Sequence, residues 1–158
     1  MIPAKIVQFL EYANVAHAGT RDANLVPHGH SVSGWALASD ARTLTVIVPE
    51  GARGHLIESL QDNGELALTV EKYPEAETYQ FKGRYVRHRP AVESDVELVT
   101  DIRERFTKAI LPVAGELAES ALRAFIRTPA LAVDIEVREI YVQTPGPGAG
   151  ARLEMVER

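Results

Sequence analysis

The sequence of 158 residues contains no cysteine. Disulfide bonds, thiolate zinc sites, iron–sulfur clusters held by cysteine and cysteine nucleophiles are therefore excluded. Long hydrophobic runs are also lacking. Gln8, Glu11 and Asn14 interrupt the first apolar segment, and no window approaches the roughly 20 apolar residues that cross a bilayer. These absences predict a cytoplasmic protein with no signal peptide and no membrane partner.

Positive charge is in short supply, because 17 Lys and Arg stand against 22 Asp and Glu, for a net charge of −5. Proteins that bind nucleic acid usually carry a basic face for the phosphates, so we expect no nucleic-acid partner. A Gly-x-Ser-x-Gly elbow and any other nucleophile–base–acid set are missing as well. No catalytic residue is assigned, which fits a protein whose cofactor carries the chemistry.

The composition is that of an ordinary folded protein, with 46% hydrophobic and 25% charged residues. Neither a repeat nor a linker divides the chain, so residues 1–158 are expected to form one domain. Alternating or β-rich patterns predict six strands, at residues 15–20, 27–37, 43–48, 65–71, 78–88 and 131–143. Helical spacing predicts helices at residues 3–13 and 52–62 and a helical insertion at about 94–126.

Two local patterns refine this prediction. The last strand alternates up to Val137 and then changes phase at Ile140, which predicts a β-bulge. In the insertion, Ser94 and Glu97 have capping-box spacing, and Pro112 is expected to interrupt the helix before a second one runs to Ile126. The basic segment 82–89 just before it could pair with the acidic helix, contact a ligand or be solvated.

Four motifs follow one another along the first ninety residues: HAGTRD at 17–22, LTVIVP at 44–49 with GARGHL at 51–56, ELALTV at 65–70 and YQFKG at 79–83. Their order and spacing resemble the pyridoxamine 5′-phosphate oxidase-like family of FMN-binding split barrels. The ending QTPGPGAG at 143–150 looks like that of an uncharacterised branch of this family. The resemblance implies a mainly β, α+β fold: a six-stranded antiparallel split β-barrel of Greek-key type with flanking helices. It also implies a homodimer with FMN at its interface.

The resemblance also implies the cofactor-binding positions. Arg53 matches the arginine of a Ser-Arg-Lys element whose serine and lysine are replaced by Ala52 and Gly54. His30 stands where pyridoxamine phosphate oxidases have an arginine, and Thr78 where they have a glutamine. The expected FMN-binding residues are Arg53, His30, Val48, Pro49, Gly54, His55, Thr78 and Gln80.

The residues themselves leave alternatives open. Arg53 at a strand-to-helix turn suits a phosphate but could equally be a solvated surface side chain. His28 and His30 are two apart on a strand and share a face, which favours a pocket lining over a metal site because no third ligand is evident. The function expected is an FMN-dependent oxidoreductase acting on a small molecule. A module for haem or the deazaflavin F420, or a cofactor-free relative, is the alternative.

Overall fold

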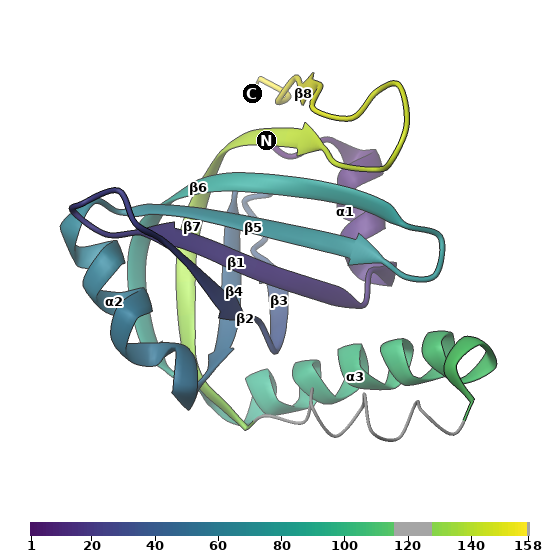
Figure 1. Ribbon diagram of the computed structural model, residues 1–158, viewed down its shortest axis with the longest axis horizontal. Helices are drawn as coiled ribbons and strands as arrows, with labels where there is room; N and C mark the ends of the chain where they lie inside the picture. Colours follow the sequence, from purple (N-terminus) through teal and green to yellow (C-terminus); the bar gives the residue numbers. More distant parts are fainter. Residues whose placement is uncertain (116–127, 158) are drawn as a thin grey trace.

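The computed structural model describes residues 1–115 and 128–157. All eight strands pair antiparallel in one sheet, in the order β2-β1-β5-β6-β7-β4-β3, with β8 added beside β7. Their bounds are β1 (Val15–Arg21), β2 (Pro27–Ser31), β3 (Gly34–Leu37), β4 (Thr43–Pro49), β5 (Glu65–Lys72), β6 (Glu77–Pro90), β7 (Pro129–Val142) and β8 (Arg152–Leu153). The sheet curls into the half-barrel of Figure 1, which is the mainly β architecture expected from the sequence.

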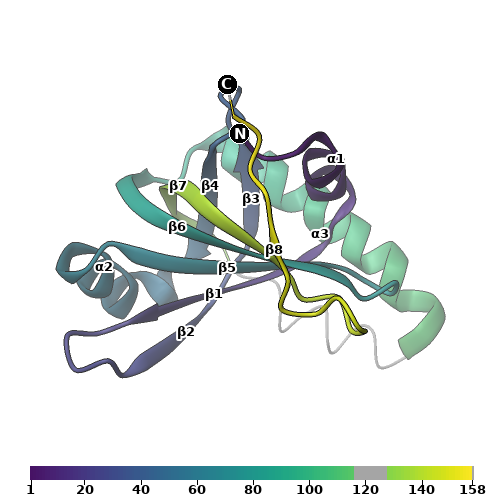
Figure 2. The same cartoon turned by 90° about the horizontal axis from the view of Figure 1, so that it is seen from above.

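Three helices of the described ranges cover the openings that the curled sheet leaves. They are α1 (Ala4–Tyr12), α2 (Arg53–Asp62) and α3 (Glu93–Ala114), and a short 3-10 turn, η1 (Glu50–Ala52), leads into α2. In both Figure 1 and Figure 2, α2 lies at one side of the half-barrel, and α1 and α3 lie at the other. No helix within the described ranges has the length and hydropathy needed to span a membrane.

Alternating burial along the strands makes the core. In β5 the side chains of Leu66, Leu68 and Val70 point inward, and every second residue between them is more exposed. Helix α2 contributes Leu56 and Leu60, which have the i, i+4 spacing that puts two side chains on one helix face. Burial of such a face is what stabilises a helix this short.

The predicted strand at 27–37 is in fact two strands, β2 and β3. The chain leaves β2 after Ser31, and the N–H of Ser33 donates to the carbonyl of Ile47, 2.7 Å away. Before this crossing β2 pairs with β1, and after it β3 pairs with β4. Gly34 permits this crossing because a Cβ there would lie only 3.0 Å from a methyl group of Val99. The split and the two-residue β8 account for the difference from the expected six strands.

The predicted bulge in the last strand is confirmed. Lys82 pairs with Glu139 and Gly83 pairs with Val137, so Arg138 is the extra residue on β7. A second irregularity lies three residues further along β6, where Val86 is left unpaired between two successive partners of β7. Each bulge sharpens the local bend and twist, so the two together help the long β6–β7 pair to wrap around the core.

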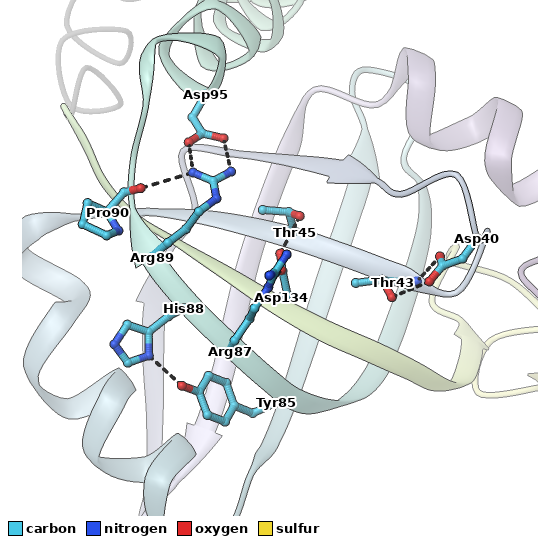
Figure 3. A network of polar contacts seen from close by, with 10 residues as sticks. All are labelled: Asp40, Thr43, Thr45, Tyr85, Arg87, His88, Arg89, Pro90, Asp95 and Asp134. Carbon is cyan, nitrogen blue, oxygen red and sulfur yellow. Dashed lines mark hydrogen bonds and ion pairs between the residues drawn. The ribbon is translucent and has the colours of Figure 1, made fainter.

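The start of α3 corrects the capping prediction. The helix begins at Glu93, and Asp95, not Glu97, reaches back: its Oδ2 accepts the N–H of Val92 at 2.8 Å. Arg89 at the end of β6 donates to both oxygens of Asp95, at 2.5 and 3.0 Å (Figure 3). The basic segment therefore pairs with the helix through Arg89, and this pair sets the helix register.

The end of α3 corrects a second expectation. Pro112 does not interrupt the helix, which continues to Ala114. Because Pro112 lies in the last turn, its missing N–H removes only one of the final hydrogen bonds. The second helix expected up to Ile126 falls outside the described residues.

Replacing Gly83 by alanine tests the close approach of β6 and β7. A Cβ at Gly83 would lie 3.0 Å from the carbonyl oxygen of Glu136 and 3.0 Å from a methyl group of Ile135. We expect G83A to lower the free energy of unfolding by about 1–3 kcal/mol, the usual effect of overpacking. Urea unfolding measures it. G19A is the matched control, because a Cβ at Gly19 on β1 meets nothing within 4 Å; equal losses in both variants would contradict the interpretation.

Candidate functional site

The β1–β2 hairpin brings two histidines to one face of the sheet. Thr20 pairs with His28 and Ala18 pairs with His30. Directly opposed residues share a face in an antiparallel pair, so both histidines lie on the side of the buried Ala18. Asp22 fixes the turn of the hairpin, because its Oδ1 accepts the N–H groups of Asn24 at 2.8 Å and of Val26 at 2.9 Å.

The entry into α2 faces these histidines. The backbone turns through η1 after Pro49, and Ala52 occupies the N-cap position of α2 without a side-chain cap. The N–H of Arg53 donates to the carbonyl of Glu50, so η1 continues into α2, and the uncapped start of this helical run is at η1, after Pro49. The first N–H groups of such a start offer donors and a partial positive charge. Gly51 leaves the backbone open here, since a Cβ would meet nothing within 4 Å. The ring of His55 stacks on that of His28, with centroids 5.2 Å apart and planes 2° from parallel.

Between the hairpin and the start of α2 lies a cavity of about 310 Å³, which we call the histidine pocket. This volume is at the lower end of the range of small-molecule sites. The pocket is lined by Pro27, His28, Gly29, His30, Ser31, Gly51, Ala52 and His55. Imidazoles from two elements distant in sequence thus meet at the uncapped end of a helix.

The three imidazoles differ in their electrostatic setting. His30 is only 7% exposed, and its Nε2 lies 2.8 Å from the hydroxyl of Thr20. Burial lowers the pKa of His30, and positive charge on His28 or His55 lowers it further. Backbone donation from Val26 chiefly keeps the pKa of Asp22 below its ordinary value, and the carboxylate lies 3.6 Å from the His28 ring. The pocket thus has a neutral imidazole at its base and an imidazole beside a carboxylate at its rim.

The sequence placed several other residues at the cofactor, and the structure puts them next to this pocket. Arg53 and Gly54 begin α2 directly after the pocket-lining Ala52. The guanidinium of Arg53 is 61% exposed and pairs with Glu50 at 3.4 Å. Val48 and Pro49 are buried at the end of β4 and lead the chain into η1, so the contact they offer is through the backbone.

Thr78 and Gln80 do not join the pocket of the same chain. They lie on β6, which β1 and β5 separate from β2. The N–H of Thr78 donates to the hydroxyl of Thr144 at 2.9 Å, and the amide of Gln80 donates to the hydroxyl of Thr69 at 3.3 Å. A role at FMN for these two residues stays a prediction that requires a second subunit.

A second hollow of about 310 Å³, the outer trough, lies on the opposite face of the sheet. Gly19 and Ala67 form its floor, and alternation puts both on the face away from the core. Arg21 and Lys82 line it with positive charge, and Glu65 is the carboxylate among the lining residues. The trough lies between the strand that carries the histidines and the strand that carries Gln80.

Sequence reasoning found the imidazoles but missed the residues that hold them. Thr20 positions His30, Asp22 pairs with His28, and Gly51 opens the backbone. The first two could have been found from the hairpin register alone, because Thr20 and Asp22 flank the turn in a motif already identified. The strand aromatics Trp35 and Tyr79 are core residues, 4% and 5% exposed.

Comparison with protein families gives a match to the family described as pyridoxamine 5′-phosphate oxidase over residues 2–141. No curated protein sequence matches the chain. HupZ of Group A Streptococcus shares the fold at 18% identity and a TM-score of 0.56, over 96% of this chain and 99% of HupZ.

Two further solved structures are similar. A pyridoxamine 5′-phosphate oxidase-related, FMN-binding protein of Nostoc punctiforme is 12% identical, with a TM-score of 0.52 over 94% of this chain and 87% of that one. HutZ, the heme storage protein of Vibrio cholerae, is 16% identical, with a TM-score of 0.50 over 90% and 95%. At these identities the likeness concerns the fold alone.

The setting of His30 predicts a pH dependence of stability. Its folded-state pKa lies below the ordinary value of about 6.5, so the unfolded chain takes up the proton first as the pH falls. The free energy of unfolding should therefore decrease as the pH falls below about 6.5, with a contribution from His30 of at most about 1.4 kcal/mol per pH unit. H30Q should show a shallower decrease when urea unfolding is measured between pH 7 and pH 5.

H17Q provides the comparison for this prediction, because His17 is an exposed histidine on the adjacent β1. It should keep the slope of the unsubstituted protein. An unchanged slope in H30Q would show that other groups control the acid sensitivity.

Proposed function

We propose that this chain, which belongs to the pyridoxamine 5′-phosphate oxidase family, binds FMN in the region of the histidine pocket and acts as a flavin-dependent oxidoreductase on a small molecule. The observation that carries the proposal is the pocket itself: an uncapped helix start with an open backbone at Gly51, faced by imidazoles, in a chain of this family. A helix N-terminus with convergent donors is suited to a phosphate monoester.

The residues present fit the phosphate end of the cofactor. The N–H groups at the uncapped start of η1 supply donors, and Arg53 supplies a guanidinium at the same turn. The present partner of Arg53 is Glu50, at 3.4 Å with both side chains largely exposed, a pair of small stability. Exchange of Glu50 for a phosphate would therefore cost little, and a charge-assisted pair with phosphate is stronger.

The side chains around the pocket bind and orient, while the cofactor supplies the redox chemistry. Bound FMN would supply the hydride transfer. The ring of His30, fixed by Thr20, presents one nitrogen to the pocket region as a neutral imidazole near pH 7. His28 and His55 stand at the rim, where they would shape the entry of the substrate.

The proposal includes a homodimer. FMN is larger than its phosphate, and in the same chain β1 and β5 lie between β2 at the histidine pocket and β6, which carries Thr78 and Gln80. The outer trough, with its flat floor of Gly19 and Ala67, offers a surface on which a second subunit and the flavin ring could pack. In a homodimer, the partner subunit would supply the missing wall of the cofactor site.

Haem binding is the second candidate function. It is favoured by the stacked imidazoles of His28 and His55 at the pocket rim, since neutral imidazole is a common axial ligand of haem iron. The family match is compatible with either cofactor. In this version His28 or His55 would ligate the iron, and the stacked pair would have to separate.

Titration with FMN tests the first proposal. Absorbance and fluorescence should show saturable binding, and Arg53→Ala should weaken the affinity at least roughly tenfold, because a charge-assisted pair with the phosphate is lost. Lys108→Ala is the control, since it removes an exposed cation from α3 on the other side of the half-barrel. Its affinity should equal that of the unsubstituted protein. Absence of binding to the unsubstituted protein would reject the FMN proposal, and F420 would be titrated next.

A haem titration separates the second candidate from the first. If haem is the ligand, a Soret band should develop at one equivalent per subunit and be diminished in H28A or H55A but not in H17A. A Soret band equal in all variants would mean that the pocket histidines are not ligands. A protein that binds neither cofactor would be a cofactor-free relative.

A further inference from the structure

A separate hollow of about 560 Å³, which we call the α1–α3 groove, lies between α1, β3 with its following turn, and α3. Its walls are mainly apolar and include Val7, Leu10, Trp35, Leu37 and Leu98. Figures 1 and 2 place α1 and α3 on the side of the half-barrel away from α2. The groove is therefore distinct from the histidine pocket.

One cation lines this apolar groove. Arg105 projects from α3, and its Nε is buried without a hydrogen-bond partner among the described residues. Burial lowers the pKa of Arg105, and the carboxylate of Asp101 offsets only part of that effect. Arginine nonetheless stays charged at any pH at which the protein is folded. A buried donor on a charged group is normally paired, because leaving it unpaired is costly.

The carboxylates nearby do not fill this role. Asp101 lies one turn before Arg105 on α3, but no ion pair forms between them. Glu104 instead faces Lys108, at 3.9 Å. Glu11 lines the groove from α1 and makes no ion pair with Arg105. Its negative charge at the wall disfavours a second negative charge on any occupant, so a monoanion is better suited than a phosphate dianion.

We propose that the α1–α3 groove binds a monocarboxylate with an apolar body, whose carboxylate pairs with Arg105. The fork of the guanidinium matches a carboxylate, and the apolar walls match a hydrocarbon or aromatic body. The volume of about 560 Å³ is ample for a ligand of this kind. The proposal does not rest on the flavin site.

Calorimetric titration with decanoate tests this proposal. The unsubstituted protein should bind decanoate saturably, and should bind decanol, which has the same chain without the charge, at least roughly tenfold more weakly. Arg105→Gln should weaken decanoate binding by a similar factor and leave decanol binding unchanged. Arg105→Lys, which keeps the charge without the fork, should fall between the two.

Two further variants control for charge and for space. Lys108→Gln removes an exposed cation from the same helix and should bind decanoate as the unsubstituted protein does. Ala36→Phe places a ring in the groove from β3 and should weaken both decanoate and decanol. Thermal unfolding of each variant verifies that it is folded. Failure of the unsubstituted protein to bind decanoate, or equal affinity in Arg105→Gln, would overturn the proposal.

Discussion

Strands β6 and β7 pair from Tyr79 with Val142 to Pro90 with Leu131, and every other strand attaches to one side or the other of this pair. β5, β1 and β2 follow beyond β6, and β4 and β3 follow beyond β7. The two irregularities in the pairing bend both strands together, which a flat ladder would not do. The approach of Gly83 to the backbone of Glu136 belongs to the same bend. The curl of the whole sheet depends on this one bulged pair.

The polar contacts near the end of β6 join the bent β6–β7 pair to β4 and to α3 (Figure 3). Arg87 donates to Asp134 on β7 at 2.7 Å, and Asp134 also accepts from Thr45 on β4 at 2.7 Å, so one buried carboxylate joins three strands. Two residues later, Arg89 holds the first turn of α3 through Asp95. The position of α3, and with it the wall of the α1–α3 groove, therefore follows from the end of β6.

Much of the fold could be predicted because local patterns of apolar and polar residues determine it. Alternation marked the strands, and a phase change between Val137 and Ile140 located a bulge that the register confirms. The split of residues 27–37 could not be found in this way. The break arises because Gly34 must pass beneath Val99 of α3, a contact between segments far apart in sequence. The capping error has a similar cause, since the residue that selects Asp95 is Arg89 on another element.

The candidate site was predictable to the extent that spacing determines it. Two residues of separation put His28 and His30 on one face, but only the folded chain stacks His55 on His28. Of the residues carried over by resemblance, only His30 and His55 line the histidine pocket. Val48, Pro49, Arg53 and Gly54 lie next to it in the chain, and Thr78 and Gln80 lie on β6. A family resemblance assigns positions along one chain. It does not say which subunit of a dimer supplies each wall of the cofactor site.

The net negative charge of the chain makes the local donors in the two hollows significant. A protein of net charge −5 repels anions on average, so an anion site must be built from local exceptions. The histidine pocket achieves this with helix amides, and the α1–α3 groove with a single guanidinium whose Nε has no partner among the described residues. The two differ in what surrounds the donors: backbone and imidazoles in one, apolar side chains in the other. Donors in a polar, open pocket favour a phosphate. A guanidinium with a buried, unpartnered Nε in an apolar groove favours a carboxylate with a hydrophobic body, because there both halves of the ligand find a matching surface.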